Sequence, residues 1–544
     1  MARLTHISSS RSLDPTPKDC DSVALPNVPQ PAITSTQHHN TPILSQECCV
    51  EAPCHDCLAC RHLRRGSEVI LRREHQRRKA DIVKAKRIPS ISCRSIQQVQ
   101  ILSSFLELHF PSKEAKADLA DRRSWLLALP EIDFSETPLL RNAVDTVCYA
   151  HLSSQHRDSR LQQESRYAYG RVLSGLMQEL GRQKPQHDPQ HITASMMLLC
   201  FYDDALPQPQ SAVSGWQAHY LGAQEFLKAR GPSSLDVSKP FDRLLFMNLR
   251  VPAIFLGIAR RQGVMLGRPE WISLGKRHSQ SNYSLALLYQ YALQIPGVME
   301  EAELVIGKRN PNRDLLEVCS KIQQLQGELS RWMRQSSLMA SYWGKHQQNL
   351  VYISDTKAFD VTVEEQCVME SNPAFVSHYK YPDYNTVQDF ALYLLFMMCL
   401  DCTLLRLLHL HPMHDSRYLR RTTEEVGRDA FATASDLCRT IHYQSGFESQ
   451  GIAGFMDLLV ALSQAFFEEV GAFDKVGWCQ AIRCATQLRV ERMRATQPKT
   501  LCRVGDLAEE IAAVGRFKMR DPRGYTLKAI SSNDMPSRGC PFAR

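Results

Sequence analysis

The chain has 544 residues, of which 43% are hydrophobic, so it could form roughly two to four ordinary domains with a large core. Its longest uninterrupted apolar runs, near 390–400 and 458–467, are too short to span a bilayer, and residues 1–17 lack the apolar core of a secretory signal. We therefore expect an intracellular protein with reduced thiols and no membrane association.

The first predicted element is an N-terminal arm, residues 1–47. It is rich in Ser, Thr, Pro, Gln and Asn and shows no apolar period. A segment of this composition cannot bury enough apolar surface to fold, so we expect the arm to be disordered.

Residues 48–95 are predicted to form a cysteine-rich segment followed by a basic linker. Cysteines at C-x2-C spacing can bind one zinc ion, because a tight turn brings both thiolates to the same side. The alternatives are unliganded cysteines in a disordered arm and an iron–sulfur site, for which no fourth cysteine follows at the needed spacing. The candidate zinc ligands are Cys49, Cys54, Cys57 and Cys60.

The net charge of the chain is +8, and the excess lies in residues 61–87. This segment holds eleven Lys and Arg against three acidic residues, so the rest of the chain is neutral. Such a run is a solvated face, a nuclear-import signal or a contact for nucleic-acid phosphates. The candidate residues are Arg61, Arg64, Arg65, Arg72, Arg73, Arg77, Arg78, Lys79, Lys84, Lys86 and Arg87.

Residues 96–520 are predicted to form a large all-α body, because apolar residues recur at helical spacing and no stretch alternates as a strand would. Thr137 and Pro138 are expected to cap and open the first strong segment, and Gly181 and Gly231 to end the second and fourth. The expected segments are 137–152, 161–181, 188–202, 216–231, 241–262, 315–332, 387–409, 423–442, 455–470 and 474–494.

Two of these segments carry more specific expectations. The apolar stripe of 161–181 is expected to run as far as Leu180. Residues 315–332 place apolar side chains three and four apart, as in a coiled-coil seam, but the seam is shorter than three heptads. We therefore favour packing within the chain over a dimer zipper. The tail, residues 521–544, is expected to be flexible.

Two groups of polar residues raise the possibility of a metal- or ligand-dependent helical enzyme. Asp203 and Asp204 form a carboxylate pair at a helix end, and His409, His411 and His414 could bind zinc. The aspartates lack a third acidic residue nearby, and the histidines span a proline break. No phosphate-binding loop or nucleophile elbow is present, so we do not expect an enzyme.

The order of cysteine-rich arm, basic linker and long helical body resembles the fungal two-zinc, six-cysteine transcription factors. Residues 57–69 are similar to the second half of the zinc cluster of that family, in which two cysteines precede a basic stretch and a last cysteine. Val69 stands at that last ligand position, and the first half of the motif has no counterpart upstream of Cys48. The resemblance therefore implies an incomplete zinc module.

The helical body resembles the fungal-specific regulatory domain that follows the zinc cluster. The likeness is strongest in the segment Trp216 to Pro232. Its signature residues are expected to be core residues without a catalytic role, with Gly222 allowing a second helix to approach closely. They are Trp216, His219, Gly222, Ala223, Leu227 and Gly231.

This resemblance implies a nuclear regulator of transcription, such as a pathway-specific regulator of a metabolic gene set. Its implied partners are DNA, through the basic segment, and the transcription machinery or a partner regulator. Zinc is the implied cofactor. The alternative is a helical co-regulator or scaffold that reaches promoters through a partner and never contacts DNA.

Overall fold

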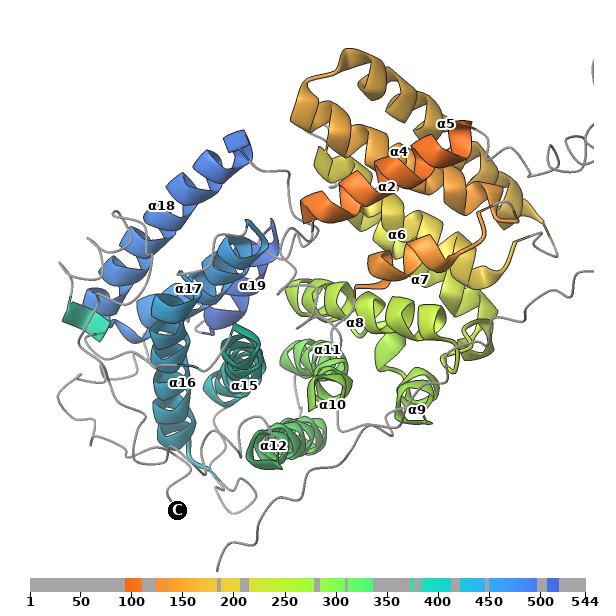
Figure 1. Cartoon of the computed structure of the whole chain (residues 1–544). Helices are drawn as coiled ribbons and strands as arrows, with labels where there is room; N and C mark the ends of the chain where they lie inside the picture. The colour runs from red at the N-terminus through yellow and green to blue at the C-terminus, as the bar shows by residue number, and fades with distance from the viewer. Residues whose placement is uncertain are drawn as a thin grey trace, which may run out of the picture. The chain divides into compact units, whose positions relative to one another are not determined.

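Figure 1 shows the computed structural model, which divides into two units, Met1–Ser90 and Ile91–Arg544. All residues that the structure describes belong to the second unit. The expected disordered arm, the basic segment and the flexible tail lie outside the described residues. The described ranges are 93–109, 124–134, 136–182, 187–205, 215–277, 284–308, 312–335, 373–375, 381, 384–411, 421–445, 450–496 and 506–517.

Every regular element in these ranges is helical, which confirms the all-α prediction. Fifteen α-helices are joined by short connections and four 3-10 turns, and the described residues contain no strand. The α-helices are α2 (Cys93–His109), α4 (Pro138–His156), α5 (Ser159–Gly181), α6 (Pro189–Ala205), α7 (Gly215–Arg230), α8 (Pro240–Arg260), α9 (Pro269–Arg277), α10 (Ser284–Ala292), α11 (Ile295–Ile306), α12 (Asn312–Gln335), α15 (Tyr384–Leu410), α16 (Thr423–Gln444), α17 (Gln450–Val470), α18 (Phe473–Thr496) and α19 (Ala508–Gly515).

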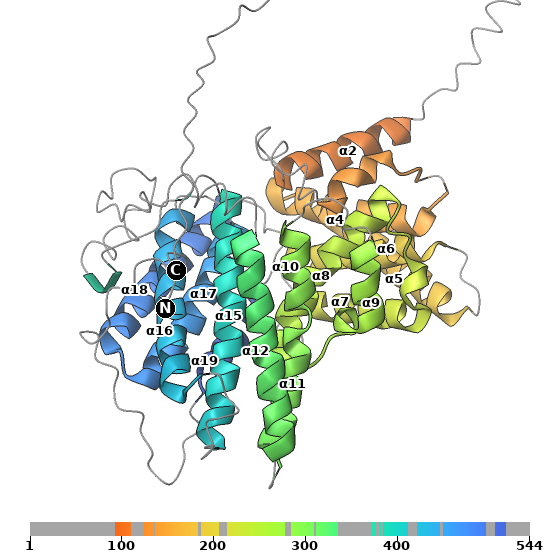
Figure 2. The same ribbon diagram turned by 90° about the horizontal axis from the view of Figure 1, so that it is seen from below.

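The helices pack mainly against their neighbours in the sequence. Helix α4 lies between α5 and α6, and α7 packs on α6. Helices α8 to α12 connect this group with α15 to α19, since α8 packs on α19 and both α11 and α12 pack on α15. Figures 1 and 2 both show the green helices between the orange and the blue ones.

The start of α4 differs in detail from the prediction. Thr137 occupies the N-cap position and Pro138 the first turn, but the Thr137 hydroxyl makes no capping hydrogen bond. It donates instead to the Asp133 carbonyl at 3.3 Å. Helix α5 has a capped start, because the Asp158 carboxylate accepts the N–H of Arg160 at 2.8 Å.

The buried face of α5 ends on a charged residue. Leu180, expected in the apolar stripe, is 51% exposed, whereas Glu179 is buried. The stripe through Ala168, Val172 and Leu176 reaches position 179 at helical spacing, and position 180 is rotated away from it. The Glu179 carboxylate accepts a hydrogen bond from Arg182 and one from the N–H of His187, so its burial is compensated.

The apolar seam of α12 faces the interior of its own chain. Leu315, Val318, Ile322, Leu325, Leu329 and Trp332 are all buried. Helix α12 packs on α10, α11 and α15. The expectation of packing within the chain is therefore confirmed for this seam.

Helix α15 is a long core helix. The apolar run that we expected to be bounded by Asp389 and Asp401 is part of one helix of 27 residues, and both aspartates are buried within it. Asn385–Leu410 is long and apolar enough to cross a membrane, but 78% of its most apolar window is buried inside the helical body. The helix contacts α10, α11, α12, α16, α17 and α19, which accounts for its apolar character.

Candidate functional site

The predicted zinc ligands and the eleven basic candidates lie outside the described residues, so their expected roles stay predictions. Within the described part of the chain, no group of three or more His, Cys, Asp or Glu side chains is placed to hold a metal ion. The features that the structure does place are the Trp216 segment and the polar groups inside the helical body.

The Trp216 segment forms α7. Trp216, Ala223 and Leu227 point to the interior and are buried. Their spacing follows one helical face, as expected. The Trp216 backbone carbonyl accepts a hydrogen bond from the Cys200 thiol of α6 at a sulfur–oxygen distance of 3.4 Å. These residues attach α7 to α6.

Tyr220 is the polar residue of this interior face. Its ring is completely buried, and its hydroxyl donates to the Leu249 carbonyl of α8 at 2.6 Å. The amide of Gln224 donates to the same hydroxyl at 2.7 Å. Sequence analysis placed Tyr220 on the buried face but could not identify Leu249 as its partner. The pair of hydrogen bonds joins α7 to α8.

Two signature glycines do not have the role expected of core residues. Gly222 is exposed, and no atom lies within 4 Å of the position that a Cβ would occupy, so the expected close helix approach at Gly222 is wrong. Gly231 follows the last residue of α7 with a φ of 76°, in the left-handed region that glycine adopts without steric cost. Gly231 therefore ends the helix, as predicted.

His219 is half-buried on the side of α7 that faces α5. Its Nε2 lies 3.2 Å from the hydroxyl of Tyr169, and the Tyr169 ring stacks on Tyr202 with centroids 4.4 Å apart. Burial lowers the pKa of His219 to about 4, so the ring is neutral at pH 7. His219 therefore links three helices as a hydrogen-bonding group and not as a cation.

The residues considered for an enzyme are not brought together as a described site. Asp203 and Asp204 lie in the last turn of α6, and His409 lies in the last turn of α15. His411 follows α15 directly, and His414 is outside the described residues.

A first polar junction connects the two ends of the helical body. The Glu303 carboxylate of α11 accepts hydrogen bonds from Arg261, which follows α8, and from Arg406 of α15. A second nitrogen of Arg261 donates to the Ala513 carbonyl of α19 at 2.9 Å. These side chains are largely shielded, with Arg406 only 15% exposed. We call Arg261, Glu303 and Arg406 the Glu303 junction.

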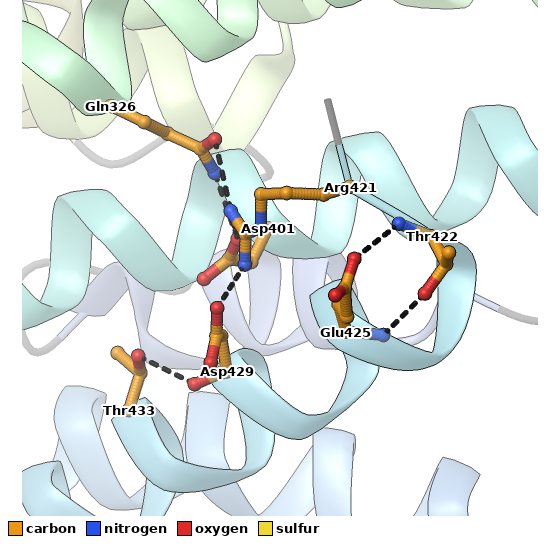
Figure 3. A network of polar contacts seen from close by, with 7 residues as sticks. All are labelled: Gln326, Asp401, Arg421, Thr422, Glu425, Asp429 and Thr433. Atoms are coloured by element: carbon orange, nitrogen blue, oxygen red, sulfur yellow. Dashed lines mark hydrogen bonds and ion pairs between the residues drawn. The ribbon is translucent and has the colours of Figure 1, made fainter. Parts of the chain in front are cut away.

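A second polar group lies deeper, between α12, α15 and α16 (Figure 3). The Gln326 amide donates to Asp401 Oδ1 at 2.8 Å, and Arg421 Nη1 lies 3.6 Å from the same oxygen. Arg421 Nη2 also donates to Asp429 Oδ2 at 2.5 Å. We call Gln326, Asp401, Arg421 and Asp429 the Asp401 network.

The start of α16 holds Arg421 in this position. Thr422 and Glu425 form a reciprocal capping box, in which the Thr422 N–H donates to Glu425 at 2.7 Å and the Glu425 N–H donates to the Thr422 hydroxyl at 3.2 Å (Figure 3). Because Arg421 directly precedes the capped residue, the box fixes its backbone.

Asp401 is buried to 1% exposure, and this burial dominates its chemistry. Loss of solvation raises the pKa of Asp401 to about 7, although Arg421 and the Gln326 hydrogen bond act in the opposite direction. The one sequence signal for this residue was a carboxylate within an apolar run. Its partners Gln326 and Arg421 are distant in the sequence and could not be identified there.

The comparisons with known proteins concern the first part of this body. Residues 103–340 match the family model described as the fungal specific transcription factor domain. The match begins within α2 and ends just after α12, so it includes the Trp216 segment. No curated protein and no solved structure matches the chain. The match confirms the resemblance to the regulatory domain, and the chain thus carries a domain of fungal transcription factors.

Proposed function

We propose that the chain regulates transcription in the nucleus. In this proposal residues 61–87 contact DNA phosphates or import receptors, and the helical body binds partner proteins, a second copy of the chain or an effector. The observation that carries the proposal is the match of residues 103–340 to a fungal transcription factor domain. The same match favours a regulator over an enzyme.

The distribution of charge supports a division of labour between the two parts. All of the excess positive charge lies in 61–87, whereas the remaining chain is neutral. A basic segment that neutralises ~4 to 6 phosphates binds DNA mainly through counterion release, with little base specificity. A neutral helical body has no comparable electrostatic attraction to nucleic acid, so it is better suited to protein or ligand partners.

The proposed zinc site is smaller than that of the resembled family. A two-zinc cluster needs six thiolates, whereas residues 48–60 hold five cysteines and Val69 occupies the last ligand position. These residues do not fit a complete cluster. We expect Cys49, Cys54, Cys57 and Cys60 to hold at most one zinc ion, with four thiolates around it.

Binding of the full chain to duplex DNA tests the proposal. We expect affinity to fall with salt, with a slope of the logarithmic plot of about −4 to −5. Replacing Arg77, Arg78 and Lys79 with glutamine should reduce the magnitude of that slope by about 2 to 3, because three phosphate contacts are lost. The matched control replaces Lys228, Arg230 and Arg243 of the helical body with glutamine and should leave the slope unchanged.

Two further measurements separate the possible outcomes. Zinc content per purified chain, with and without Cys57→Ser and Cys60→Ser, tells whether the cysteines bind metal. Chromatin occupancy after deletion of residues 1–89 tells whether the arm brings the protein to promoters. Occupancy that persists without the arm would contradict direct DNA binding and would support the co-regulator alternative.

A further inference from the structure

Arg250 is a buried cation inside the domain that matches the family model. It lies on α8 with only 3% of its surface exposed. Its guanidinium is placed over the ring of Phe246, with 4.5 Å between the guanidinium carbon and the ring centroid. Phe246 in turn stacks on Trp271 of α9, with centroids 6.3 Å apart. The charge therefore lies against aromatic side chains.

The hydrogen-bonding capacity of Arg250 is mostly unused. Nη1 donates to the Ala286 carbonyl of α10 at 3.3 Å. Nε is buried and has no hydrogen-bond partner, and Nη2 forms no hydrogen bond with the described residues. In a guanidinium the N–H of Nε and one N–H of Nη2 point the same way, and together they bind two oxygens of a carboxylate or phosphate. This edge is the unused one.

No carboxylate of the described residues compensates the charge. No ion pair joins Arg250 to a described residue. The stretch that forms α9 and α10 has no acidic residue between Glu270 and Glu300. Helix α8 contains one acidic residue, Asp242, whose carboxylate accepts the Asp236 N–H at 2.9 Å. The neighbouring elements thus supply aromatic contact and one carbonyl oxygen but no anion.

A buried, unpaired guanidinium costs several kcal/mol, and protein charges in this position are normally paired. Burial lowers the pKa of Arg250 to about 10, so the group still carries its charge at pH 7. The cation–π contact returns only part of this cost, about 2 kcal/mol or less. The arrangement is that of a cation prepared for an anion that the described residues do not supply.

Gly275 keeps the space beside the unused edge open. A Cβ at position 275 would lie 2.1 Å from Nη2 and 3.2 Å from the guanidinium carbon. Any larger residue in α9 would therefore displace the guanidinium. Glycine is not needed here for its backbone freedom, since residue 275 lies within α9, so its role is to leave room for the guanidinium.

We propose that Arg250, Phe246, Trp271 and Gly275 form a binding site for a small organic anion. The ligand carries a carboxylate or phosphate that pairs with the Nε and Nη2 edge, and an apolar part that contacts the aromatic rings. This combination of a few polar groups on an apolar wall is typical of small-molecule sites. The inference goes beyond the proposed function, because it assigns an effector site that works independently of DNA binding.

The test measures binding of two probes, inorganic phosphate and succinate, to the purified full chain. Phosphorus NMR line broadening follows phosphate, and calorimetry follows succinate. We expect saturable binding with a dissociation constant on the order of 1 mM or tighter for at least one probe. Arg250→Met should weaken it at least tenfold, and Arg250→Lys should weaken it less, since the charge is kept and the fork is lost.

Matched variants distinguish this site from the other basic residues of the chain. Arg243→Met removes an exposed arginine from the same helix and should leave binding unchanged. The glutamine variant of Arg77, Arg78 and Lys79 should also keep the Arg250-dependent binding, which separates this site from phosphate contacts of the basic segment. Gly275→Ala should reduce binding while the charge is retained, and circular dichroism verifies the fold of each variant.

The two probes also identify the class of ligand. Preference for phosphate assigns a phosphorylated effector and preference for succinate a carboxylic acid, and either result supports the site. Equal binding by the wild-type chain, Arg250→Lys and Gly275→Ala would overturn it, as would wild-type binding that disappears with the basic-segment variant alone. If Arg250→Met does not fold, the lysine and alanine variants decide.

Discussion

The two ends of the helical body, α2 to α12 and α15 to α19, are alike in architecture and different in recognisability. The family match covers only the first. The packing does not stop at that limit, because Phe255 of α8 meets Phe396 of α15 with ring centroids 6.5 Å apart, and Trp332 of α12 meets Tyr393 at 6.4 Å. The comparison teaches that the folding unit is larger than the region recognised by its sequence.

Two polar contacts cross the same boundary, and they differ in depth. The Glu303 junction is partly open to solvent, with the Glu303 side chain 34% exposed. The Asp401 network is closed, with the Asp401 side chain 2% exposed. The first is expected to stabilise the body through its ion pairs, whereas the second fixes the arrangement of three helices at an electrostatic cost.

The largest effect is expected from removing the second end altogether. A chain truncated after residue 340 keeps the whole matched region but exposes the apolar faces of α8, α11 and α12 that pack on α15 and α19. We expect loss of cooperative thermal unfolding and strong binding of a hydrophobic dye. A truncated chain that unfolds cooperatively at the temperature of the full chain would show that the two ends are independent.

A smaller effect is expected at the Glu303 junction. Glu303→Gln keeps the shape of the side chain but leaves Arg261 and Arg406 without their shared carboxylate. We expect a loss of about 2 kcal/mol in the free energy of unfolding by urea. Glu301→Gln, which removes an exposed pair with Lys321, is the control and should cost less than about 0.5 kcal/mol.

The Asp401 network predicts a pH dependence. Because the folded-state pKa of Asp401 is about 7 and the unfolded value is near 3.8, the folded chain binds the proton more tightly. The contribution of Asp401 to stability therefore falls as pH rises from about 4 to 7. Between pH 5 and pH 7 the wild-type chain should lose about 2 kcal/mol relative to Asp401→Asn.

Urea unfolding at several pH values measures this difference. Glu424→Gln, an exposed acidic residue at the start of α16, is the control and should follow the wild-type curve. A constant difference between wild type and Asp401→Asn across this range would mean that Asp401 is ionised throughout.

The smallest effect is expected at the capping box. Thr422→Ala removes the hydroxyl that accepts the Glu425 N–H, and we expect a loss of about 1 kcal/mol. Thr423→Ala, one residue inside the helix, should have little effect. The capping variant should also loosen Arg421, so its cost should be lower in the Asp401→Asn background. Strict additivity would separate the cap from the network.

The sequence was sufficient to predict the long amphipathic helices but not all of the shorter ones. The segments from α4 to α8, α12 and α15 to α18 were predicted, since each has an apolar stripe of several turns. Helices α9, α10 and α19 have only nine, nine and eight residues, too few for a clear period. The 3-10 turn Trp125–Glu131, which buries Trp125 completely, was also missed for this reason.

The candidate sites could be predicted only in part, because their partners are brought together by the fold. Asp401 and Arg250 each stand out as a charge within an apolar helix, and this signal was available in the sequence. What could not be read was the difference between them, since Asp401 meets Arg421 and Gln326, whereas Arg250 meets aromatic rings and a glycine. Local pattern shows that a charge is misplaced, and only packing shows what compensates it.

The buried aspartates of α15 also bear on how the chain is made. While it is being synthesised, α15 leaves the ribosome before the helices that later cover it, and by length and composition it could be taken for a membrane-spanning segment. A carboxylate near the centre of such a segment raises the cost of insertion into the bilayer by about 2.5 to 3.5 kcal/mol. Asp401 and Asp389 therefore direct α15 away from the membrane and toward its own fold, a benefit during biogenesis that balances the cost of Asp401 in the finished protein.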